Sequence, residues 1–168
     1  MELQMRIGLG QFSELTEEKI LFAKELGIKD LLFNTPALPG EKQWEFKDLL
    51  QLRMACEDAG VRLAAIENVP QRFYDKVMLG LPGCEEQMEH MAATIRNIGK
   101  AGIPIFGYCW MPNGVWRTSR TTPGRGGAKV TGFDMELAKD APLTHGRIYT
   151  DDEMWANYEY FMRGIVPV

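Results

Sequence analysis

The chain has 168 residues, 45% of them hydrophobic and 25% charged, a composition typical of a globular domain that excludes a disordered chain. Its formal net charge is -4, and lysines and arginines are scattered singly, so there is no basic stripe for nucleic acid or an acidic membrane. No stretch approaches the roughly 20 apolar residues of a membrane span, and the amino-terminal sequence lacks the long apolar core of a signal peptide. We therefore expect a cytoplasmic protein.

Four short apolar runs recur along the chain and predict strands. They are nearly continuous rather than alternating, which favours a parallel sheet covered by helices. They lie at 5–11, 28–34, 61–68 and 103–111, and we expect Tyr108 to Met111 to be the end of the fourth strand.

Helices are predicted between these runs. Thr16 is an N-cap followed by two glutamates, and apolar residues recur at helical spacing from 49 to 59 and from 88 to 95. Thr150 and Glu153 form a capping box that begins the last helix. Three glycines stand where a helix needs a left-handed residue after its end, namely Gly27, Gly60 and Gly102.

A long insertion at 112–149, rich in Gly, Pro, Thr and Arg, precedes the last helix. A loop of that length without structure of its own is usually functional or partly disordered. Its glycine-rich stretch at 122–129 lacks the GxxxxGK[ST] spacing of a phosphate loop, so we interpret it as a flexible flap.

The three cysteines are odd in number and widely spaced, which favours reduced thiols over a disulfide or zinc framework. Cys56 falls on a helical apolar stripe and Cys109 within a predicted strand, where a small buried hydrophobic side chain is the expected role. Cys84 is the third.

The elements make four strand–helix units in a single α/β domain that spans 1–168. Such alternation allows an open doubly wound sheet or a (β/α) barrel. A complete barrel has eight units and typically about 250 residues, so this chain supplies about half of one.

In either architecture, ligand sites form at the carboxyl ends of the parallel strands. The second strand leads to Asn34, the third to Glu67 and Asn68, and the fourth to Tyr108 and Trp110. Asn34 before Thr-Pro is as readily an Asx turn as a ligand contact. Glu67 ends an otherwise apolar strand, which leaves a general base, a metal ligand and a salt-bridge partner open. The first strand leads to Gln11 at the same rim.

The insertion adds further candidates. Trp110 and Trp116 suit either the core or the apolar face of a sugar ring, and Arg117 can hold a carboxylate through paired charge-assisted hydrogen bonds or remain a solvated loop arginine. His145 could reach the rim as an acid or base. Glu67, Cys109 and His145 are conceivable metal ligands, but nothing in their spacing indicates a metal site.

With these residues in view, the chain resembles the amino-terminal part of a mannonate dehydratase, within the xylose-isomerase-like TIM barrels. The stretches that carry the resemblance are RMACEDAGVRLAAIENVP (53–70), GLPGCEEQMEHMAATIRNIGKAGIP (80–104), YCWMPNGVWRTS (108–119) and YTDDEMWANYEYFMRGIVPV (149–168). The resemblance runs through nearly all of this chain and about half of a family member.

The resemblance implies a lyase of hexuronate degradation that uses Mn²⁺ or Fe²⁺ and removes water from D-mannonate to give 2-dehydro-3-deoxy-D-gluconate. This chemistry needs an anchor for the substrate carboxylate, a base and a Lewis acid. Arg117 fits the anchor, Glu67 and His145 fit acid–base roles, and the other substrate-binding candidates are Asn34, Asn68, Tyr108, Trp110 and Trp116. The family's His, Cys and Asp metal ligands come from later strands, so we expect them to be absent from this chain.

Other functions remain open at this stage. One alternative is a non-catalytic α/β binding or assembly module, and another is a sugar isomerase or epimerase that uses Glu67. Because a half barrel leaves two open sheet edges, we expect either a homo-oligomer or association with a carboxy-terminal half. The expected ligand is a small sugar acid.

Overall fold

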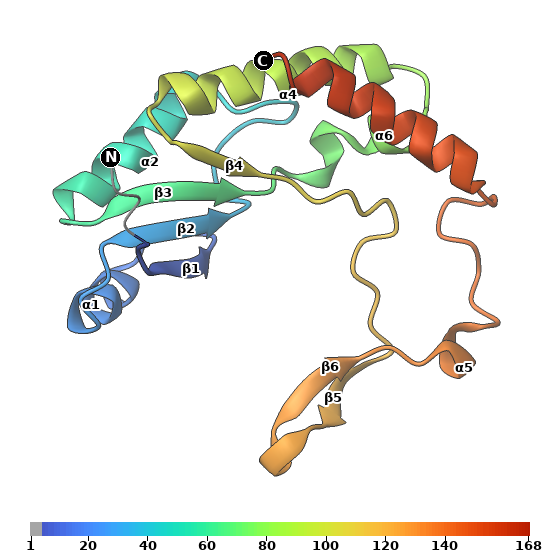
Figure 1. Ribbon diagram of the computed structural model, residues 1–168, viewed down its shortest axis with the longest axis horizontal. Coiled ribbons are helices and arrows are strands. Elements are labelled where there is room, and N and C mark those ends of the chain that lie inside the picture. The colour runs from blue at the N-terminus through green and yellow to red at the C-terminus, as the bar shows by residue number, and fades with distance from the viewer. Residues whose placement is uncertain (1–4) are drawn as a thin grey trace.

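The computed structural model describes residues 5–168, and its centre is a four-stranded parallel sheet (Figure 1). The strands lie side by side in chain order, β1 (Gly8–Phe12), β2 (Asp30–Asn34), β3 (Arg62–Glu67) and β4 (Ile105–Gly107). A doubly wound sheet reverses its strand order at a switch point, whereas a barrel keeps sequential order. The predicted α/β fold of the half-barrel type is confirmed.

Helices connect the strands and lie along one side of the sheet. In Figure 1, α2 (Phe46–Asp58) and α4 (Cys84–Lys100) run above the strands, and α6 (Asp151–Ile165) continues beside α4. The remaining helices are α1 (Glu17–Glu25), α3 (Asp75–Leu79), α5 (Met135–Ala138) and the 3₁₀ turns η1 (Gln71–Phe73) and η2 (Arg125–Gly127). The opposite face of the sheet is open in this view, toward the hairpin described below.

The local signals for helix ends are confirmed. Thr16 accepts a hydrogen bond from the Lys19 N–H, and Thr150 and Glu153 form both bonds of the capping box. The glycines expected after three helices all have a left-handed φ, of 68°, 77° and 77° in chain order for Gly27, Gly60 and Gly102.

The hydrophobic core lies between the sheet and the helices. Phe33, Leu63 and Ile66 from the strands are fully or nearly fully buried against Leu49, Cys56 and Met91 from α2 and α4. Trp44 and Phe73 meet edge to face, with ring centroids 5.9 Å apart, and close the core at the side of η1.

The fourth strand is shorter than expected, and the prediction that Tyr108 to Met111 end it is wrong. β4 stops at Gly107. The Cys109 carbonyl accepts a hydrogen bond of 2.5 Å from the Tyr74 hydroxyl, and Tyr108 and Trp110 pack on Phe161 of α6. Side-chain contacts to α6 replace the strand ladder at these residues.

The insertion at 112–149 has more secondary structure than expected of a loop. β5 (Ser119–Pro123) and β6 (Lys129–Gly132) form an antiparallel hairpin, with η2 at its tip, and α5 follows. The stretch interpreted as a flexible flap is therefore the tip of a hairpin. Figure 1 shows this hairpin standing away from the sheet on two extended legs of the chain.

β1 and β4 are the two edges of the sheet, each with one neighbouring strand among residues 5–168. Ile105, at the β4 edge, is 57% exposed. None of the described helices combines the length and the apolar content needed to cross a membrane.

Candidate active-site rim

Polar side chains from three neighbouring strands meet at the carboxyl end of the sheet. The Gln11 Nε2 donates to Glu67 Oε2, and the Gln11 Oε1 accepts from Asn34 Nδ2 at 2.9 Å. The Asn34 Oδ1 in turn accepts from the Thr35 hydroxyl at 2.9 Å and from Asn68 Nδ2 at 3.4 Å. We call these five residues the rim network.

The backbone brings these side chains together. The parallel register pairs Asn34 with Glu67 and Glu67 with Gly107, which sets the ends of β2, β3 and β4 level. The chain then turns at Thr35 and Asn68, which have positive φ of 44° and 62°. Their N–H groups donate 2.8 Å hydrogen bonds to the Glu67 and Gly107 carbonyls across the sheet. The rim is thus fixed by the main chain as well as by side chains.

The rim network is directional, because its donors point toward the carboxylate. A hydroxyl donates to the Asn34 carbonyl, the Asn34 amide donates to Gln11, and the Gln11 amide donates to Glu67. Glu67 Oε2 is engaged in this way, while Oε1 has no hydrogen bond within the described chain. One oxygen of a positioned carboxylate therefore remains available to a ligand or a proton.

Gly107 is the neighbour of Glu67 in the parallel register, and an added Cβ there would make only an ordinary van der Waals contact with it. A Cβ placed on Gly107 would lie 3.8 Å from both the Cα and the Cγ of Glu67. The carboxylate stem therefore lies directly against the neighbouring strand, which limits its movement.

Gln11 was expected at the rim because it stands at the end of the first strand, although the sequence assigned no catalytic or binding role to it. The rule that selected Asn34 and Glu67 applies equally to it, so its position was the available signal. The structure makes it the link between the other two, since its amide contacts both.

Tyr108 and Trp110 face α6 instead of the rim network. The Tyr108 hydroxyl lies 2.7 Å from the Tyr158 hydroxyl, and burial together with this neighbour raises the pKa of Tyr108 to about 12. Trp110 packs on Tyr158 and Phe161, with ring centroids 5.1 Å apart in each case. Both side chains fasten the end of β4 to the helix.

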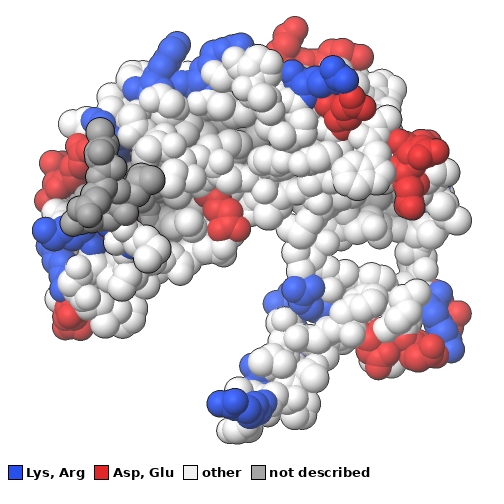
Figure 2. Space-filling model, viewed as in Figure 1, with Lys and Arg blue, Asp and Glu red and all other residues white. Residues whose placement is uncertain are grey.

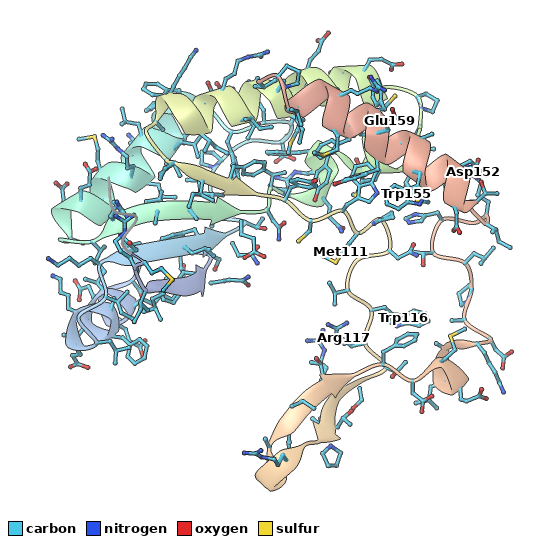
Figure 3. The ribbon with its side chains drawn as sticks, in the orientation of Figure 1. Met111, Trp116, Arg117, Asp152, Trp155 and Glu159 are labelled. Carbon is cyan, nitrogen blue, oxygen red and sulfur yellow. The ribbon has the colours of Figure 1, made fainter. Side chains whose placement is uncertain are left out.

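Arg117 and Trp116 lie at the base of the hairpin, apart from the strand ends (Figure 3). The Arg117 Nε donates to the Thr131 hydroxyl at 3.2 Å, and its guanidinium also donates to the Trp116 carbonyl at 3.1 Å. Trp116 meets Phe133 edge to face at 5.6 Å. The structure thus does not place Arg117 beside Glu67.

His145 joins the two legs of the hairpin. Its Nε2 donates to the Pro112 carbonyl at 3.0 Å, and its ring meets Tyr149 edge to face at 6.1 Å. No hydrogen bond links it to the rim network in the described part of the chain.

The rim does not form a metal site with the residues at hand. No group of three His, Cys, Asp or Glu side chains within residues 5–168 is arranged to hold a metal ion. Glu67 is the acidic member of the rim network, and its neighbours there are amides and a hydroxyl, which are poor ligands for Mn²⁺ or Fe²⁺ without further carboxylates or imidazoles.

A second polar cluster lies at the amino ends of the strands, beside a cavity of about 500 Å³. Asp30, 7% exposed, binds Arg6 at 2.9 Å and Arg62 at 2.7 Å. In this cluster the buried charge is already paired, and the amino end of a barrel is where structural residues are expected. We assign it to stability.

The sequential parallel sheet, with a polar rim at its carboxyl ends, defines the class of protein as a barrel-type α/β fold with an enzyme-like rim. A family model described as D-mannonate dehydratase (UxuA) matches residues 1–150. The chain belongs to this family, as the resemblance predicted.

Individual relatives agree. A mannonate dehydratase of Streptococcus equi subsp. zooepidemicus is 25% identical over 166 residues, which cover 84% of this chain and 45% of that protein. One of Thermotoga maritima is 33% identical over 112 residues, covering 66% of this chain and 30% of that protein. The crystal structure of mannonate dehydratase from Streptococcus suis serotype 2 matches with a TM-score of 0.82 at 24% identity.

The match covers nearly all of this chain but only part of each relative. The alignment to the Streptococcus suis structure covers 98% of this chain and 50% of that one. The chain therefore spans about half the length of the relatives it matches.

Proposed function

We propose that this chain carries part of the substrate pocket of a sugar-acid dehydratase that converts D-mannonate to 2-dehydro-3-deoxy-D-gluconate and water. The observation that carries the proposal is the rim network, in which Gln11 holds one oxygen of Glu67 at the carboxyl ends of parallel strands and leaves the other free. Membership of the mannonate dehydratase family supports the choice of substrate.

In this proposal Glu67 is the base. Dehydration removes the proton from the carbon next to the substrate carboxylate and expels the hydroxyl from the following carbon. The free Oε1 can accept the first proton, while Gln11 and Asn34 act as positioning residues that fix the carboxylate. Asn68 and Thr35 support Asn34 in the same way.

Arg117 is the proposed anchor for the substrate carboxylate and His145 the proposed acid for the leaving hydroxyl, with Trp116 beside the sugar chain. All three belong to the hairpin and its legs, so these roles require the hairpin to lie over the rim when substrate is bound. Mn²⁺ or Fe²⁺ would supply Lewis-acid chemistry, as in the family. Because the described residues do not form a ligand set, we assign no step to the metal.

Binding tests this proposal without requiring turnover. In ¹⁵N-edited NMR spectra of the chain, D-mannonate should shift the backbone amides of Asn34, Thr35 and Asn68 at millimolar concentrations, in the usual range of KM values. D-mannose, which lacks the carboxylate, should shift them less. Equal shifts for both sugars, or no shift at the rim, would refute the proposal.

Variants separate the roles. Arg117→Ala should weaken D-mannonate binding about 10-fold or more, the usual loss of one charged hydrogen bond, while Lys129→Ala, a cation farther along the hairpin, should not. Glu67→Gln should leave binding unchanged or tighten it, because it removes a negative charge beside an anionic substrate. With Mn²⁺ added, we expect the chain alone to form negligible 2-keto acid in a semicarbazide assay.

A further inference from the structure

Each of the first three strands begins beside a positively charged residue. Arg6 lies two residues before β1, Lys29 directly precedes β2, and Arg62 is the first residue of β3. The parallel register pairs Gly8 with Asp30 and Asp30 with Arg62, so the three strands begin level with one another. The three cations therefore meet at the amino end of the sheet.

These cations line the cavity at that end together with a single acid. The cavity, which we call the amino-end cavity, has a volume of about 500 Å³, within the roughly 300–1,000 Å³ of small-molecule sites. Among the described residues that line it, Arg6, Lys29 and Arg62 are the cations and Asp30 is the acid, so three positive charges less one negative charge leave a net charge of +2. In Figure 2, blue surface lies at the left end of the molecule, where β1, β2 and β3 begin in Figure 1.

The ion pairs of Asp30 hold two of these cations in place without neutralising both. Asp30 Oδ2 lies 2.9 Å from Arg6 Nε, and Asp30 Oδ1 lies 2.7 Å from Arg62 Nη2. These pairs stabilise the fold, but one carboxylate balances only one of the two guanidinium charges. A guanidinium group has five N–H donors, so both arginines keep donors for a second acceptor. Lys29 is exposed and forms no ion pair within residues 5–168.

The other walls of the amino-end cavity are apolar. Ile7, Leu26 and Ile28 line it, and Ile7 and Leu26 are 75% and 55% exposed. Exposed apolar side chains beside fixed cations suit a ligand that has an anionic group at one end and an apolar body at the other.

A phosphate monoester fits this set of groups better than a carboxylate does. The charge of a phosphate dianion matches the net charge of +2, and its three terminal oxygens allow one for each cation. Planar guanidinium groups bind phosphate through paired hydrogen bonds, and a lysine adds a point charge. A carboxylate has two oxygens and a single charge, so it would leave one cation of the cavity without a partner.

We propose that the amino-end cavity binds a phosphate monoester with an apolar body, whose phosphate is held by Arg6, Lys29 and Arg62. This site is separate from the rim network, because Arg62 and Glu67 stand at opposite ends of β3, about 17 Å apart at the usual rise of a strand. The proposal uses neither the rim network nor turnover, so it does not depend on the dehydratase function.

Titration calorimetry and ¹⁵N-edited NMR spectra test the proposal with inorganic phosphate and phenyl phosphate as probes. Under mildly alkaline conditions, where both probes are dianions, each should bind at millimolar concentrations and shift the backbone amides of Lys29, Asp30 and Arg62. The amides of Asn34 and Asn68 at the rim should not shift. Phenyl phosphate should bind about 5-fold tighter than inorganic phosphate, because its ring covers part of the apolar wall. Sodium chloride at the same ionic strength should cause none of these shifts.

Single substitutions identify the cations that hold the phosphate. Lys29→Ala should weaken the binding of phenyl phosphate about 10-fold, the usual loss of one charged hydrogen bond, and it leaves both ion pairs of Asp30 intact. Arg6→Gln should weaken binding by a similar factor. Its fold should be retained, as far-UV circular dichroism would check, because the Arg6 side chain is 63% exposed and Arg62 still pairs with Asp30.

The matched control is Lys47→Ala. It removes the same charge from an exposed lysine in the first turn of α2, outside the amino-end cavity, and should bind phenyl phosphate as the wild-type chain does.

Several results would overturn the proposal. Shifts that chloride reproduces at equal ionic strength, or equal weakening by Lys47→Ala and Lys29→Ala, would reduce the binding to a general attraction between charges. Unchanged binding in Lys29→Ala would contradict the site directly. Amide shifts confined to residues 117–132 would assign the phosphate to the hairpin instead. Equal affinity for phenyl phosphate and inorganic phosphate would refute the role of the apolar wall, and with it the monoester.

Discussion

Phe161 anchors α6 to the end of β4, and Phe161→Ala should reveal how much that anchor contributes to stability. The side chain has no exposed surface, and its ring lies 5.8 Å from Tyr74, 5.2 Å from Tyr108 and 5.1 Å from Trp110. Truncating a buried phenylalanine costs about 3–5 kcal/mol, and each lost aromatic pair is worth about 0.5–1.5 kcal/mol beyond its buried area. Since these contributions overlap, we expect about 4 kcal/mol, a large part of the roughly 5–15 kcal/mol that stabilises a typical domain.

The assay is urea unfolding followed by far-UV circular dichroism, at protein concentrations low enough for the chain to be monomeric. Trp155→Ala on the same helix is the control. Because Trp155 is 68% exposed, its loss should cost less than about 1 kcal/mol. If Phe161→Ala costs no more than this control, the aromatic cluster does not hold α6 in place and the structural reasoning is refuted.

Three further predictions concern a thiol, a helix cap and the glutamate of the capping box. Burial raises the pKa of the Cys56 thiol to about 11, so at pH 8 Cys56 should react with a thiol reagent only after unfolding; mass spectrometry showing rapid labelling in the folded chain would contradict this. Thr150→Ala should cost about 1 kcal/mol in urea unfolding, because it removes the oxygen that accepts the Glu153 N–H. The Thr150 N–H and Arg147 lower the pKa of Glu153. The contribution of ionised Glu153 to the stability of the fold is therefore complete above the ordinary glutamate pKa of about 4.3 and is lost as the pH falls through the lowered value. Glu153→Gln should flatten that part of the stability–pH profile.

The parts of the fold that were predicted correctly depend on neighbours in sequence. A left-handed residue after a helix requires only a glycine at one position, as at Gly60, and the capping box at Thr150 spans four residues. The sheet order followed because four similar units alternate along the chain. These signals are complete within a short window of sequence.

The errors arose where distant residues decide the structure. The apolar run through Tyr108 has the composition of a strand, but its carbonyls and rings are taken up by Tyr74 and Phe161, which are far away in sequence. The hairpin was missed for a different reason. β5 and β6 bury no face, so they show no alternation of apolar and polar residues, and their threonines and glycines look like a loop.

The candidate site divides in the same way. The strand ends predicted which polar groups would meet at the rim, because parallel strands end at the same edge of the sheet regardless of the conformation of the loops that follow. They could not predict the pattern of donors and acceptors among those groups. Asn34, for which an Asx turn and a ligand contact were both open, uses its oxygen for Thr35 and Asn68 and an amide hydrogen for Gln11. Among the described residues, this leaves two rim oxygens without a hydrogen-bond donor, Glu67 Oε1 and the buried Asn68 Oδ1, and Glu67 supplies the charged one.

The segment 117–132, which contains the β5–β6 hairpin, and the rim network differ in charge, and this bears on how a complete site could form. The rim network is internally hydrogen-bonded, whereas residues 117–132 carry four cations and no acidic residue. A sugar acid needs a positive anchor that the rim lacks, since the charged member of the rim network is Glu67. A site that binds such a ligand on this chain must therefore draw its cation from outside the rim network, and in the proposed pocket that cation is Arg117. In the proposed pocket, the position of the hairpin relative to the rim decides whether a carboxylate can be held beside Glu67.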